Sequence, residues 1–313
     1  MISIAMTTYN GEDYLREQLD SILSQTVTDW ELVACDDSST DGTLSILNEY
    51  AARDGRIRVH VNENNLGFKK NFEKAISLCT GDYIALCDQD DIWYTNHLEY
   101  LLNNIADKSM SGANAVLIDK EGRDLNRRLN EADNFLFMPE GDKFLFRVIL
   151  TSGPIQGASM LVRRDFLRRC LPIPEPVKFH DAWFVACACL DCGISYSFEP
   201  ISKYRQHGNN VTFFAHNGDN RSISAKIKSR LKILFKGLPT DRFCYCRELK
   251  SRYGLGSRSF SGIYNTLEDI RLKKNRVRTL VFLWKNYFNI ATQKTHKSFL
   301  KQYVIWNRWH EHD

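Results

Sequence analysis

The sequence predicts an α/β protein whose core is a mostly parallel sheet. Short apolar runs alternate with longer amphipathic segments over the first 120 residues, which is the spacing of strands joined by helices. Strands connected through helices run parallel, because each helix returns the chain to the same end of the sheet. The expected strands are residues 2–6, 31–35, 57–61, 82–87 and 113–119.

The segments between these runs have the pattern of helices with one buried face. Leu15, Leu19 and Ile22 recur at intervals of three or four residues and form an apolar stripe. The second helix, at residues 41–53, follows Ser, Thr and Asp residues that favour helix N-caps. The third, at residues 67–79, collects its Phe and Ala side chains on one side.

The pattern is less regular after residue 120. Three prolines at alternate positions, Pro172, Pro174 and Pro176, predict a stiff and exposed connector. The elements expected after it are a helix at residues 181–192 and strands at residues 194–198 and 200–206, followed by basic helical segments.

Charge divides the chain into two parts. The net charge is +4, but residues 221–313 contain 21 Lys and Arg against 6 Asp and Glu, so the preceding part is acidic. A basic region of this kind favours an anionic surface, and we expect no nucleic-acid partner because no nucleic-acid-binding motif is found. The expected organisation is a body at residues 1–210, with halves at residues 1–119 and 120–210, and a helical basic region at residues 211–313.

Composition narrows the class of protein. The 313 residues are 43% hydrophobic, which is ordinary for a globular protein. The start lacks the basic segment of a signal peptide, and the late apolar run at residues 280–284 is too short to cross a bilayer. Nine cysteines, an odd number, indicate reduced thiols, so we expect a cytoplasmic protein.

The most informative segment is GDYIALCDQDDIW, which starts at residue 81. Its apolar run ends in three carboxylates, Asp88, Asp90 and Asp91. Carboxylates this close repel one another unless a cation lies between them, and hard divalent cations bridge carboxylates to phosphate oxygens. The segment therefore predicts a metal–diphosphate site, with a solvated acidic turn and helix N-cap as the alternative.

Polar loops follow four of the expected strands and meet at one edge of the sheet. They contain TTYNG from residue 7, CDDSSTDG from residue 35, NENNLG from residue 62 and DQDD from residue 88. Ligands of parallel α/β sheets bind beyond the carboxyl ends of the strands. The loops contain neither a P-loop nor a GxGxxG pattern, which argues against an NTPase or a dinucleotide enzyme.

The chain resembles family 2 glycosyltransferases of the GT-A type over residues 1 to about 210. The resemblance rests on TTYNGEDYLREQLDSILSQT, DDSSTDGT, NENNLGFKKNF and CDQDDIW, and YRQHGNNVT is similar to rhamnosyltransferases of O-antigen (lipopolysaccharide) and capsule clusters. It implies a GT-A fold with a Rossmann-like sheet, which the helical basic region at residues 211–313 extends at the C-terminal side. It also implies inverting transfer of a sugar from a nucleotide-diphosphate donor, dTDP-L-rhamnose or alternatively a UDP-hexose or UDP-N-acetylhexosamine, to a saccharide or lipid-linked acceptor.

The resemblance implies roles for residues at the nucleotide edge. The residues expected to bind the nucleotide are Thr7, Thr8, Tyr9, Asp37, Lys70, Asn71 and Asp88. Asp37 is alternatively a turn or cap carboxylate. Lys70 stands where the family usually has arginine, so a bidentate contact becomes a point charge, and a solvated helix residue is the alternative.

The metal and diphosphate roles fall on two segments. The resemblance implies that Asp90 binds Mg²⁺ or Mn²⁺ directly, with Asp88 near the ribose or metal-bound water, whereas Asp91 is expected to cap the next helix. Mg²⁺ needs only one or two carboxylates when phosphates supply further ligands. Arg205 and His207 are expected to meet the diphosphate, and His207 also to complete the metal shell, with a structural histidine as the alternative.

The catalytic base is expected in the segment FHDAW, which resembles the start of the acceptor-side helix in the family. The resemblance implies that Asp181 deprotonates the acceptor hydroxyl, and a helix-capping role is the alternative. Aromatic neighbours would favour a base with a raised pKa. The residues expected on the acceptor side are Gln156, Gly157, His180 and Trp183, with Gly157 allowing close approach of the backbone to a sugar.

An apolar stripe in the basic region suggests contact with a membrane. Its members, which are flanked by lysines and arginines, are Ile227, Leu231, Leu234 and Phe235. This composition is typical of a helix lying in a membrane interface, so we expect residues 222–313 to dock on the anionic inner face of the cell membrane. The alternative is a helix that packs its stripe on the domain.

Two other functions are alternatives to glycosyl transfer for this sequence. A sugar-1-phosphate nucleotidylyltransferase shares this kind of sheet, but its Gly-rich loop with Arg and Lys is missing from residues 7–16. A non-catalytic carbohydrate- or membrane-binding protein would be marked by loss of the acidic residues, and these are present.

Overall fold

The computed structural model describes residues 1–132, 144–145, 148–149, 155–208, 240–255 and 258–271. The chain divides into two compact units, Met1–Glu140 with Ser152–Phe214 and Gly141–Thr151 with Ala215–Asp313. Gly141–Thr151 therefore groups with the C-terminal part of the chain, although the sequence analysis places it inside the body at residues 1–210.

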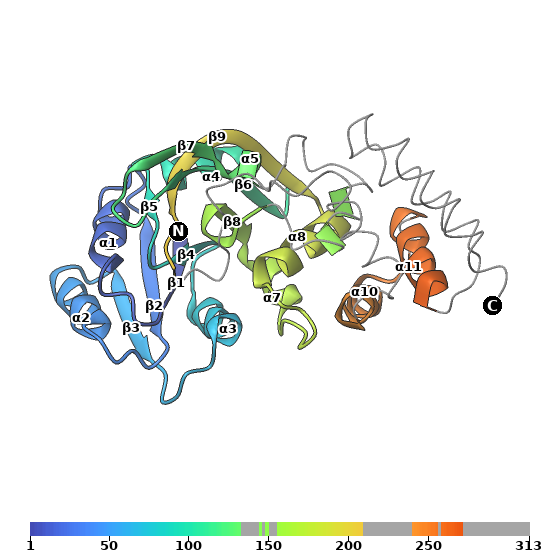
Figure 1. Cartoon of the computed structure of the whole chain (residues 1–313), viewed down its shortest axis with the longest axis horizontal. Helices are drawn as coiled ribbons and strands as arrows, with labels where there is room; N and C mark the ends of the chain where they lie inside the picture. Colours follow the sequence, from blue (N-terminus) through green and yellow to red (C-terminus); the bar gives the residue numbers. More distant parts are fainter. Residues whose placement is uncertain (133–143, 146–147, 150–154, 209–239, 256–257, 272–313) are drawn as a thin grey trace. The chain divides into compact units, whose positions relative to one another are not determined.

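A nine-stranded mixed sheet forms the centre of the first unit in the described part of the chain (Figure 1). The strands are β1 Ile2–Thr8, β2 Trp30–Asp36, β3 Ile57–Val61, β4 Tyr83–Asp88, β5 Ile92–Trp93, β6 Met110–Ile118, β7 Asp124–Arg128, β8 Met160–Arg163 and β9 Ile194–Arg205. Their order is β3-β2-β1-β4-β8-β6-β9-β5, with β7 paired to β6. The first four strands run parallel, whereas β8 is antiparallel to both β4 and β6.

Helices cover both faces of this sheet. In the first unit they are α1 Leu15–Leu23, α2 Thr43–Arg53, α3 Phe68–Leu78, α4 His97–Asn104, α5 Leu129–Ala132, α7 Arg164–Cys170 and α8 His180–Leu190, with the 3₁₀ helix η1 Gly157–Ser159. Figure 1 shows α1 and α2 on one side of the strands β1 to β3 and α3 on the other. The predicted α/β architecture with a largely parallel first half is therefore confirmed.

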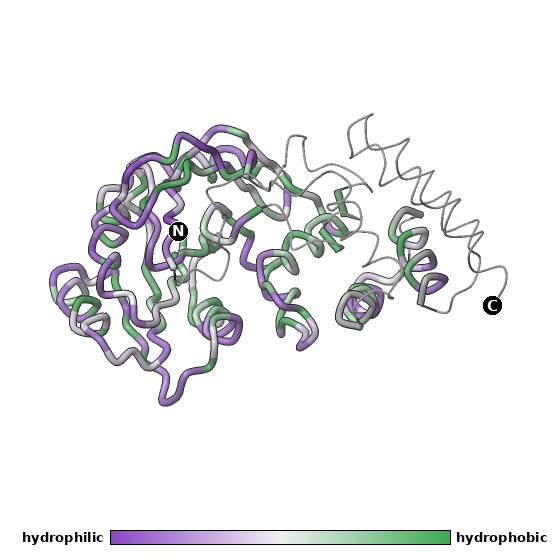
Figure 2. The backbone as a smooth tube through the Cα atoms, viewed as in Figure 1, coloured by the Kyte–Doolittle hydropathy of each residue, from purple (hydrophilic) through white to green (hydrophobic). Residues whose placement is uncertain are grey.

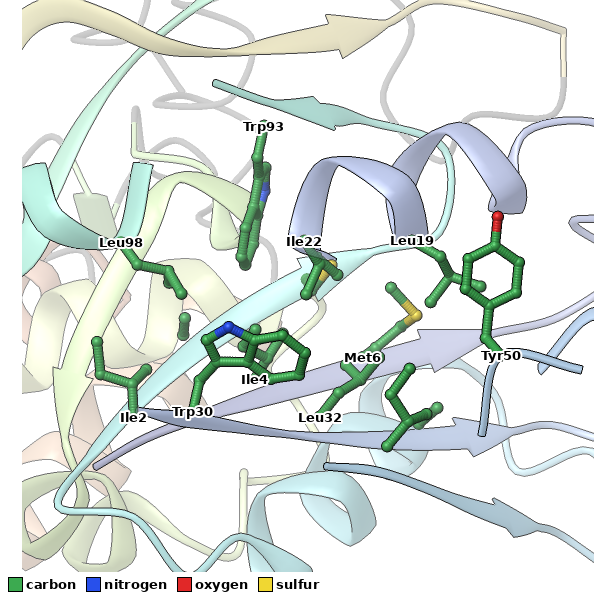
Figure 3. Packing of buried hydrophobic residues seen from close by; sticks show 14 of the residues in the cluster. Ile2, Ile4, Met6, Leu19, Ile22, Trp30, Leu32, Tyr50, Trp93 and Leu98 are labelled. Carbon is green, nitrogen blue, oxygen red and sulfur yellow. The ribbon is translucent and has the colours of Figure 1, made fainter. Parts of the chain in front are cut away.

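The core follows from the alternation of side chains along the strands. Ile2, Ile4 and Met6, at alternate positions of β1, lie on the face covered by α1, where Leu19 and Ile22 pack with them (Figure 3). All five side chains are at most 2% exposed. Burying an aliphatic side chain of this size contributes about 1.5–3 kcal/mol relative to leaving it exposed, which explains why the expected helical stripe faces the sheet.

Three later elements differ from the expectations. β9 is one continuous strand, Ile194–Arg205, where two strands were expected. The proline-rich connector is only partly exposed, because Ile173 and Val177 are buried. The helix after the acidic segment begins at His97, so the expectation that Asp91 caps it is wrong.

Helix α8 is apolar on every side. All of its residues from Ala182 to Ala188 are buried, and the backbone tube in Figure 2 is coloured mostly as hydrophobic along this helix. A helix that is hydrophobic all round belongs in the interior of a protein. The body of α8, from Ala182 to Ala188, is therefore held in the interior by packing on all sides.

The second unit contains α10 Thr240–Tyr253 and α11 Arg258–Arg271. Tyr245 and Leu249 of α10 are buried, as are Ile263 and Leu267 of α11. The apolar stripe at residues 227–235 and most of the basic region lie outside the described residues. Among the residues that are described, no helix is both long and apolar enough to cross a membrane.

Candidate active site

Parallel pairing brings three strand ends together at one edge of the sheet. In the register of β1 with its neighbours, Thr7 lies beside Asp88 and Thr8 lies beside Asp36. The Thr8 hydroxyl donates a hydrogen bond to Asp36 Oδ1 (2.9 Å), and both residues are buried. Thr8 therefore supports this edge from the inside. The contacts of Thr7 and Thr8 with a nucleotide stay predictions.

Tyr9 is 49% exposed at the start of the first loop. Its backbone N–H donates to Gln89 Oε1 (2.8 Å), and Gln89 Nε2 donates back to the Tyr9 carbonyl (3.0 Å). This reciprocal pair joins the first loop to the acidic loop. A Cβ at Gly11 would lie 2.3 Å from the end of the Gln89 side chain, which would have to move out of this pair. The exposed Tyr9 ring is accessible to a ligand.

The buried carboxylate of Asp37 organises the loop after β3. It accepts hydrogen bonds from Asn62 Nδ2 (2.6 Å) and from the backbone N–H groups of Leu66 (2.8 Å) and Gly67 (2.9 Å). Asn71 is buried in the same network, where its Oδ1 accepts from Asn62 Nδ2 (2.9 Å). Asp37 and Asn71 thus hold the loop in shape, and their contacts with a nucleotide stay predictions.

Lys70 lies near the start of α3 and is paired with carboxylates. Its Nζ is 2.8 Å from Glu73 Oε2 and 3.7 Å from Glu175 Oε1. The hydrogen bond to Glu73 raises the pKa of Lys70, so the ammonium is charged at neutral pH. Its side chain is 40% exposed. Lys70 therefore resembles the solvated helix residue of the alternative, and its nucleotide contact stays a prediction.

Negative charge is concentrated at the end of β4. Burial, together with the negative charges of Asp90 and Asp181, raises the pKa of Asp88 to about 8. Burial and the charges of Asp90 and Asp88 raise the pKa of Asp91 well above its usual range. The influence of Asp181 on Asp88 places the expected base within electrostatic reach of the acidic edge.

Arg205, whose side chain is 1% exposed, supports the acidic loop from within the fold. Its Nε donates to the Asp90 carbonyl (2.9 Å), and its backbone N–H donates to Asp91 Oδ1 (3.1 Å). The two remaining guanidinium nitrogens donate to the Lys120 carbonyl (3.1 Å) and to Glu17 Oε2 (2.5 Å). Arg205 is therefore a buried brace of this loop, and its contact with a diphosphate stays a prediction.

His207 lies beside the carboxylate of Asp90. The distance from His207 Nε2 to Asp90 Oδ2 is 2.7 Å, and the imidazole is 4.9 Å from the Tyr14 ring. The two residues expected to share a metal are therefore adjacent. In this arrangement the histidine is a hydrogen-bond partner that orients Asp90, and its direct role as a ligand stays a prediction.

Asp181 lies in the first turn of α8, after the N-cap residue Phe179. The carboxylate accepts a hydrogen bond from the backbone N–H of Ala182 (2.6 Å). The positive end of the helix dipole favours the ionised form of an acid in this turn. Phe179 occupies the N-cap position without a side-chain hydrogen bond, and Asp181 satisfies a first-turn N–H from inside the helix, so the capping alternative stays open and the role of Asp181 as the base stays a prediction.

His180 is buried directly before Asp181. Its ring stacks on Phe72 at 4.1 Å, and burial lowers its pKa to about 3, so the imidazole is neutral. Both ring nitrogens are buried without a hydrogen-bond partner in the described structure. A Cβ at Gly157 would lie 2.9 Å from His180 Nε2. Gly157 therefore allows close packing against His180, whereas close approach to a sugar was expected.

The other two expected acceptor residues lie on either side of this contact. Trp183 is fully buried, and its Nε1 donates to the Cys170 carbonyl (2.8 Å). This burial gives Trp183 a role in packing α8 against α7 and corrects the expectation of acceptor contact. Gln156 is half-buried just before η1, and its contact with an acceptor stays a prediction.

The structure adds Glu17, Tyr14 and Gln89 to the residues at this edge. Glu17 meets Arg205 across 188 positions of sequence, Tyr14 meets His207, and Gln89 joins two loops. The local sequence does not reveal these contacts, because no feature of the residues around Glu17, Tyr14 or Gln89 reports a partner on a distant segment. All nine cysteines are free, as expected.

The acidic edge is chemically suited to a hard divalent cation. Asp88 and Asp90 supply carboxylate oxygens, and burial together with the neighbouring negative charges raises the pKa of Asp88, which a bound cation would reverse. Within the described residues, no group of three or more His, Cys, Asp and Glu side chains is arranged to hold a metal by itself. The residues therefore fit a cation that takes its remaining ligands from phosphate oxygens.

Comparison with known sequences identifies relatives of the chain. The family model "Glycosyl transferase family 2" matches residues 3–171. A glycosyltransferase from Haemophilus influenzae is 29% identical over 239 residues, which cover 73% of this chain and 72% of that protein. The Escherichia coli enzyme WfgD, named as a UDP-Glc:alpha-D-GlcNAc-diphosphoundecaprenol beta-1,3-glucosyltransferase, is 35% identical over 111 residues, covering 36% of this chain and 43% of WfgD.

Solved structures share the fold. TarS 1-349 from S. aureus in complex with UDP-GlcNAc has a TM-score of 0.59 at 19% identity, covering 94% of this chain and 82% of that chain. The mannosyltransferase PcManGT from Pyrobaculum calidifontis, in complex with GDP-Man and Mn²⁺, has a TM-score of 0.53 at 17% identity, covering 94% and 86%. The chain belongs to glycosyl transferase family 2, as a glycosyltransferase with the GT-A fold.

Proposed function

We propose that this glycosyltransferase inverts configuration as it moves a sugar from a nucleotide-diphosphate donor to a saccharide or lipid-linked acceptor. The proposed setting is assembly of a bacterial surface polysaccharide such as O-antigen or capsule. The feature that supports this most directly is the carboxylate-rich end of β4, where burial and the charges of Asp90 and Asp181 raise the pKa of Asp88 to about 8. A contribution from Asp181 to this shift supports a base that lies near the edge suited to hold a diphosphate.

In the proposed mechanism Asp181 accepts the proton of the acceptor hydroxyl. As that proton leaves, the hydroxyl oxygen attacks the anomeric carbon, and the bond from this carbon to the diphosphate oxygen breaks on the opposite face. One carboxylate is sufficient, as in the base half of inverting glycoside hydrolysis, and the transition state has oxocarbenium character. The proton remains on Asp181, and the bonding electron pair leaves with the nucleoside diphosphate.

Asp90 and Asp88 are the residues that would hold Mg²⁺ or Mn²⁺. When bound, the cation supplies Lewis acidity that neutralises charge on the leaving diphosphate. The structure of PcManGT with Mn²⁺ supports a divalent cation in this fold. His207 orients the Asp90 carboxylate through their 2.7 Å contact, and Arg205 holds the Asp90 backbone.

The nucleotide is proposed to lie between Tyr9 and the loop that Asp37 braces. dTDP-L-rhamnose is the proposed sugar donor, on the resemblance of the sequence motifs to rhamnosyltransferases. A UDP-hexose or UDP-N-acetylhexosamine is the second candidate, and it is favoured by the UDP donors named for WfgD and for the TarS complex. A lipid-linked acceptor is supported by the diphosphoundecaprenol named for WfgD.

A donor panel tests this proposal. The protein is incubated with dTDP-L-rhamnose and with UDP sugars in Mn²⁺, and release of nucleoside diphosphate is measured with an acceptor present. Asp181→Asn should lower turnover by about 10²–10⁴-fold while nucleotide binding is kept. Full activity of this variant would refute the role of Asp181. Release of pyrophosphate from sugar phosphate and NTP would instead indicate a nucleotidylyltransferase.

A further inference from the structure

Helix α3 connects the nucleotide edge to the helix that carries Asp181. It begins at Phe68, directly after Gly67, whose backbone N–H is bound by Asp37 (2.9 Å). The following residues of α3 contact the connector that leads into α8. A single helix thus lies between the loop proposed for the nucleotide and the proposed base.

Lys69 holds the turn that precedes α8. This turn is closed by a hydrogen bond from the Val177 N–H to the Pro174 carbonyl (2.9 Å). Lys69 Nζ lies 3.5, 3.2 and 3.2 Å from the carbonyl oxygens of Pro174, Glu175 and Val177. An ammonium group has three donors, so its number of donors matches these three acceptors. The Lys69 side chain is only 16% exposed, so the contact is largely shielded from water.

Two further contacts hold the connector at its ends. The Glu73 carboxylate accepts a hydrogen bond from the Ile173 backbone N–H. At the other end, His180 stacks on Phe72 with an angle of 29° between the rings. The N-cap of α8 makes no side-chain hydrogen bond of its own. The start of α8 is therefore located by α3, and Asp181 is the next residue along the chain.

We propose that Lys69 and Glu73 are positioning residues that set the place of the base Asp181, an inference that rests on the proposed function. They act through the backbone of the connector. The base must meet the acceptor hydroxyl in a narrow range of distance and angle, and misplacement by about 1 Å costs on the order of 10²-fold in rate. Loss of the Lys69 ammonium should therefore lower the rate of transfer and leave donor binding intact, whereas Glu73 also pairs with Lys70, so its variant is read by hydrogen exchange alone.

Lys69→Met tests this, because it removes the ammonium and keeps the apolar stem. We expect kcat, normalised to the amount of protein that binds the donor, to fall about 10- to 100-fold. The Kd of the nucleotide should stay within about twofold of the wild type. Lys69→Arg should recover part of the rate. Lys120→Met is the matched control, since the Lys120 side chain is 67% exposed and pairs with its sequence neighbour Glu121. It should retain full activity.

Hydrogen exchange measured by mass spectrometry tests the same inference without an activity assay. In Lys69→Met the amides of residues 173–184 should exchange about tenfold faster or more, and those of β1 and β4 should be unchanged. Glu73→Gln should show the same pattern with a smaller effect, and it serves if Lys69→Met does not fold.

Unchanged exchange at residues 173–184 would overturn the positioning role, whatever the activity. A loss of nucleotide affinity as large as the loss of turnover would also overturn it, because Lys69 would then act at the donor. If the wild type transfers no sugar, the proposed function is wrong. The exchange result would still decide whether α3 holds the start of α8.

Discussion

Charge at the acidic edge is the main feature at the scale of single residues. The pKa of Asp88 is raised to about 8 by burial and by its acidic neighbours, while the hydrogen bond and charge of Arg205 act in the opposite direction on Asp91. A cation that binds the ionised carboxylates would relieve this repulsion. Binding of a cation and loss of a proton are therefore linked at this edge.

Asp90→Ala should abolish the rise in melting temperature that Mn²⁺ and a nucleoside diphosphate produce together. The rise exists because a ligand that binds only the folded state stabilises it. Thermal unfolding is measured with the nucleotide in Mn²⁺ and in EDTA. Asp107→Ala, which removes an exposed carboxylate paired with Lys108, is the control and should behave like the wild type. An equal rise in Mn²⁺ and in EDTA for the wild type would contradict the metal site.

Arg205→Met should lower the free energy of unfolding by about 3 kcal/mol, because it removes the guanidinium hydrogen bonds to the Asp90 and Lys120 carbonyls and the positive charge beside the buried Asp91. Urea unfolding measures this. Glu17→Gln should cost less than about 1 kcal/mol, since the Glu17 side chain is 58% exposed and its pair is screened by water. Equal losses for the two variants would contradict the role of Arg205 as a brace of the acidic loop.

At the scale of elements, junctions between strands and helices are closed by buried aromatic pairs. His97 at the start of α4 stacks on Trp93 of β5 at 4.0 Å, and its Nδ1 lies 3.2 Å from the Ile201 carbonyl of β9. Burial lowers the pKa of His97 to about 3. This junction follows the acidic loop directly in the chain, because β5 begins at Ile92.

The free energy of unfolding should fall as pH decreases from about 6.5 toward 4 more steeply in the wild type than in His97→Phe. Below its ordinary pKa of 6.5 the histidine binds a proton in the unfolded chain but stays neutral in the folded protein until about pH 3, so the unfolded state gains protons first. Urea unfolding across this range measures the two slopes. Other titrating groups are common to both proteins, and parallel curves would contradict the assignment.

At the scale of the whole molecule, the chain joins an acidic body to a basic region. Residues 221–313 hold 21 of the 42 Lys and Arg. The body carries the acidic edge, and its described part has a well-packed α/β core. A protein that serves a lipid-linked acceptor gains from attraction of its basic region to anionic lipid, which acts over about a Debye length.

Changing Lys228 and Lys232 together to Gln should weaken binding to anionic liposomes. Each lysine near such a surface contributes about 1 kcal/mol, so a loss of roughly 30-fold is expected at low salt. Co-sedimentation of the full chain measures it. The matched control is Lys120→Gln with Lys178→Gln, which removes the same charge from the body. An equal loss in the control would show a non-specific charge effect and contradict docking through residues 222–313.

The first half of the fold was predictable because its signals are local. β3 was expected at its observed bounds, and β1, β2 and β4 within two residues, since an apolar run or a helical stripe is decided by neighbouring side chains. β8 was missed because a strand of four residues has too little pattern to identify. The position of β8 between β4 and β6, antiparallel to both, was not predicted either. Strand pairing depends on contacts between segments far apart in the sequence, and no local pattern encodes them.

The sequence by itself determined the α/β class, the order of the early elements and the acidic residues at the end of β4. Only the tertiary structure decided that Arg205 braces these residues, that Trp183 is buried, and that Lys69 holds the connector before Asp181. The physical reason is distance along the chain. Lys69 and Val177 are 108 positions apart, and such contacts form only after the sheet and its helices have brought the segments together.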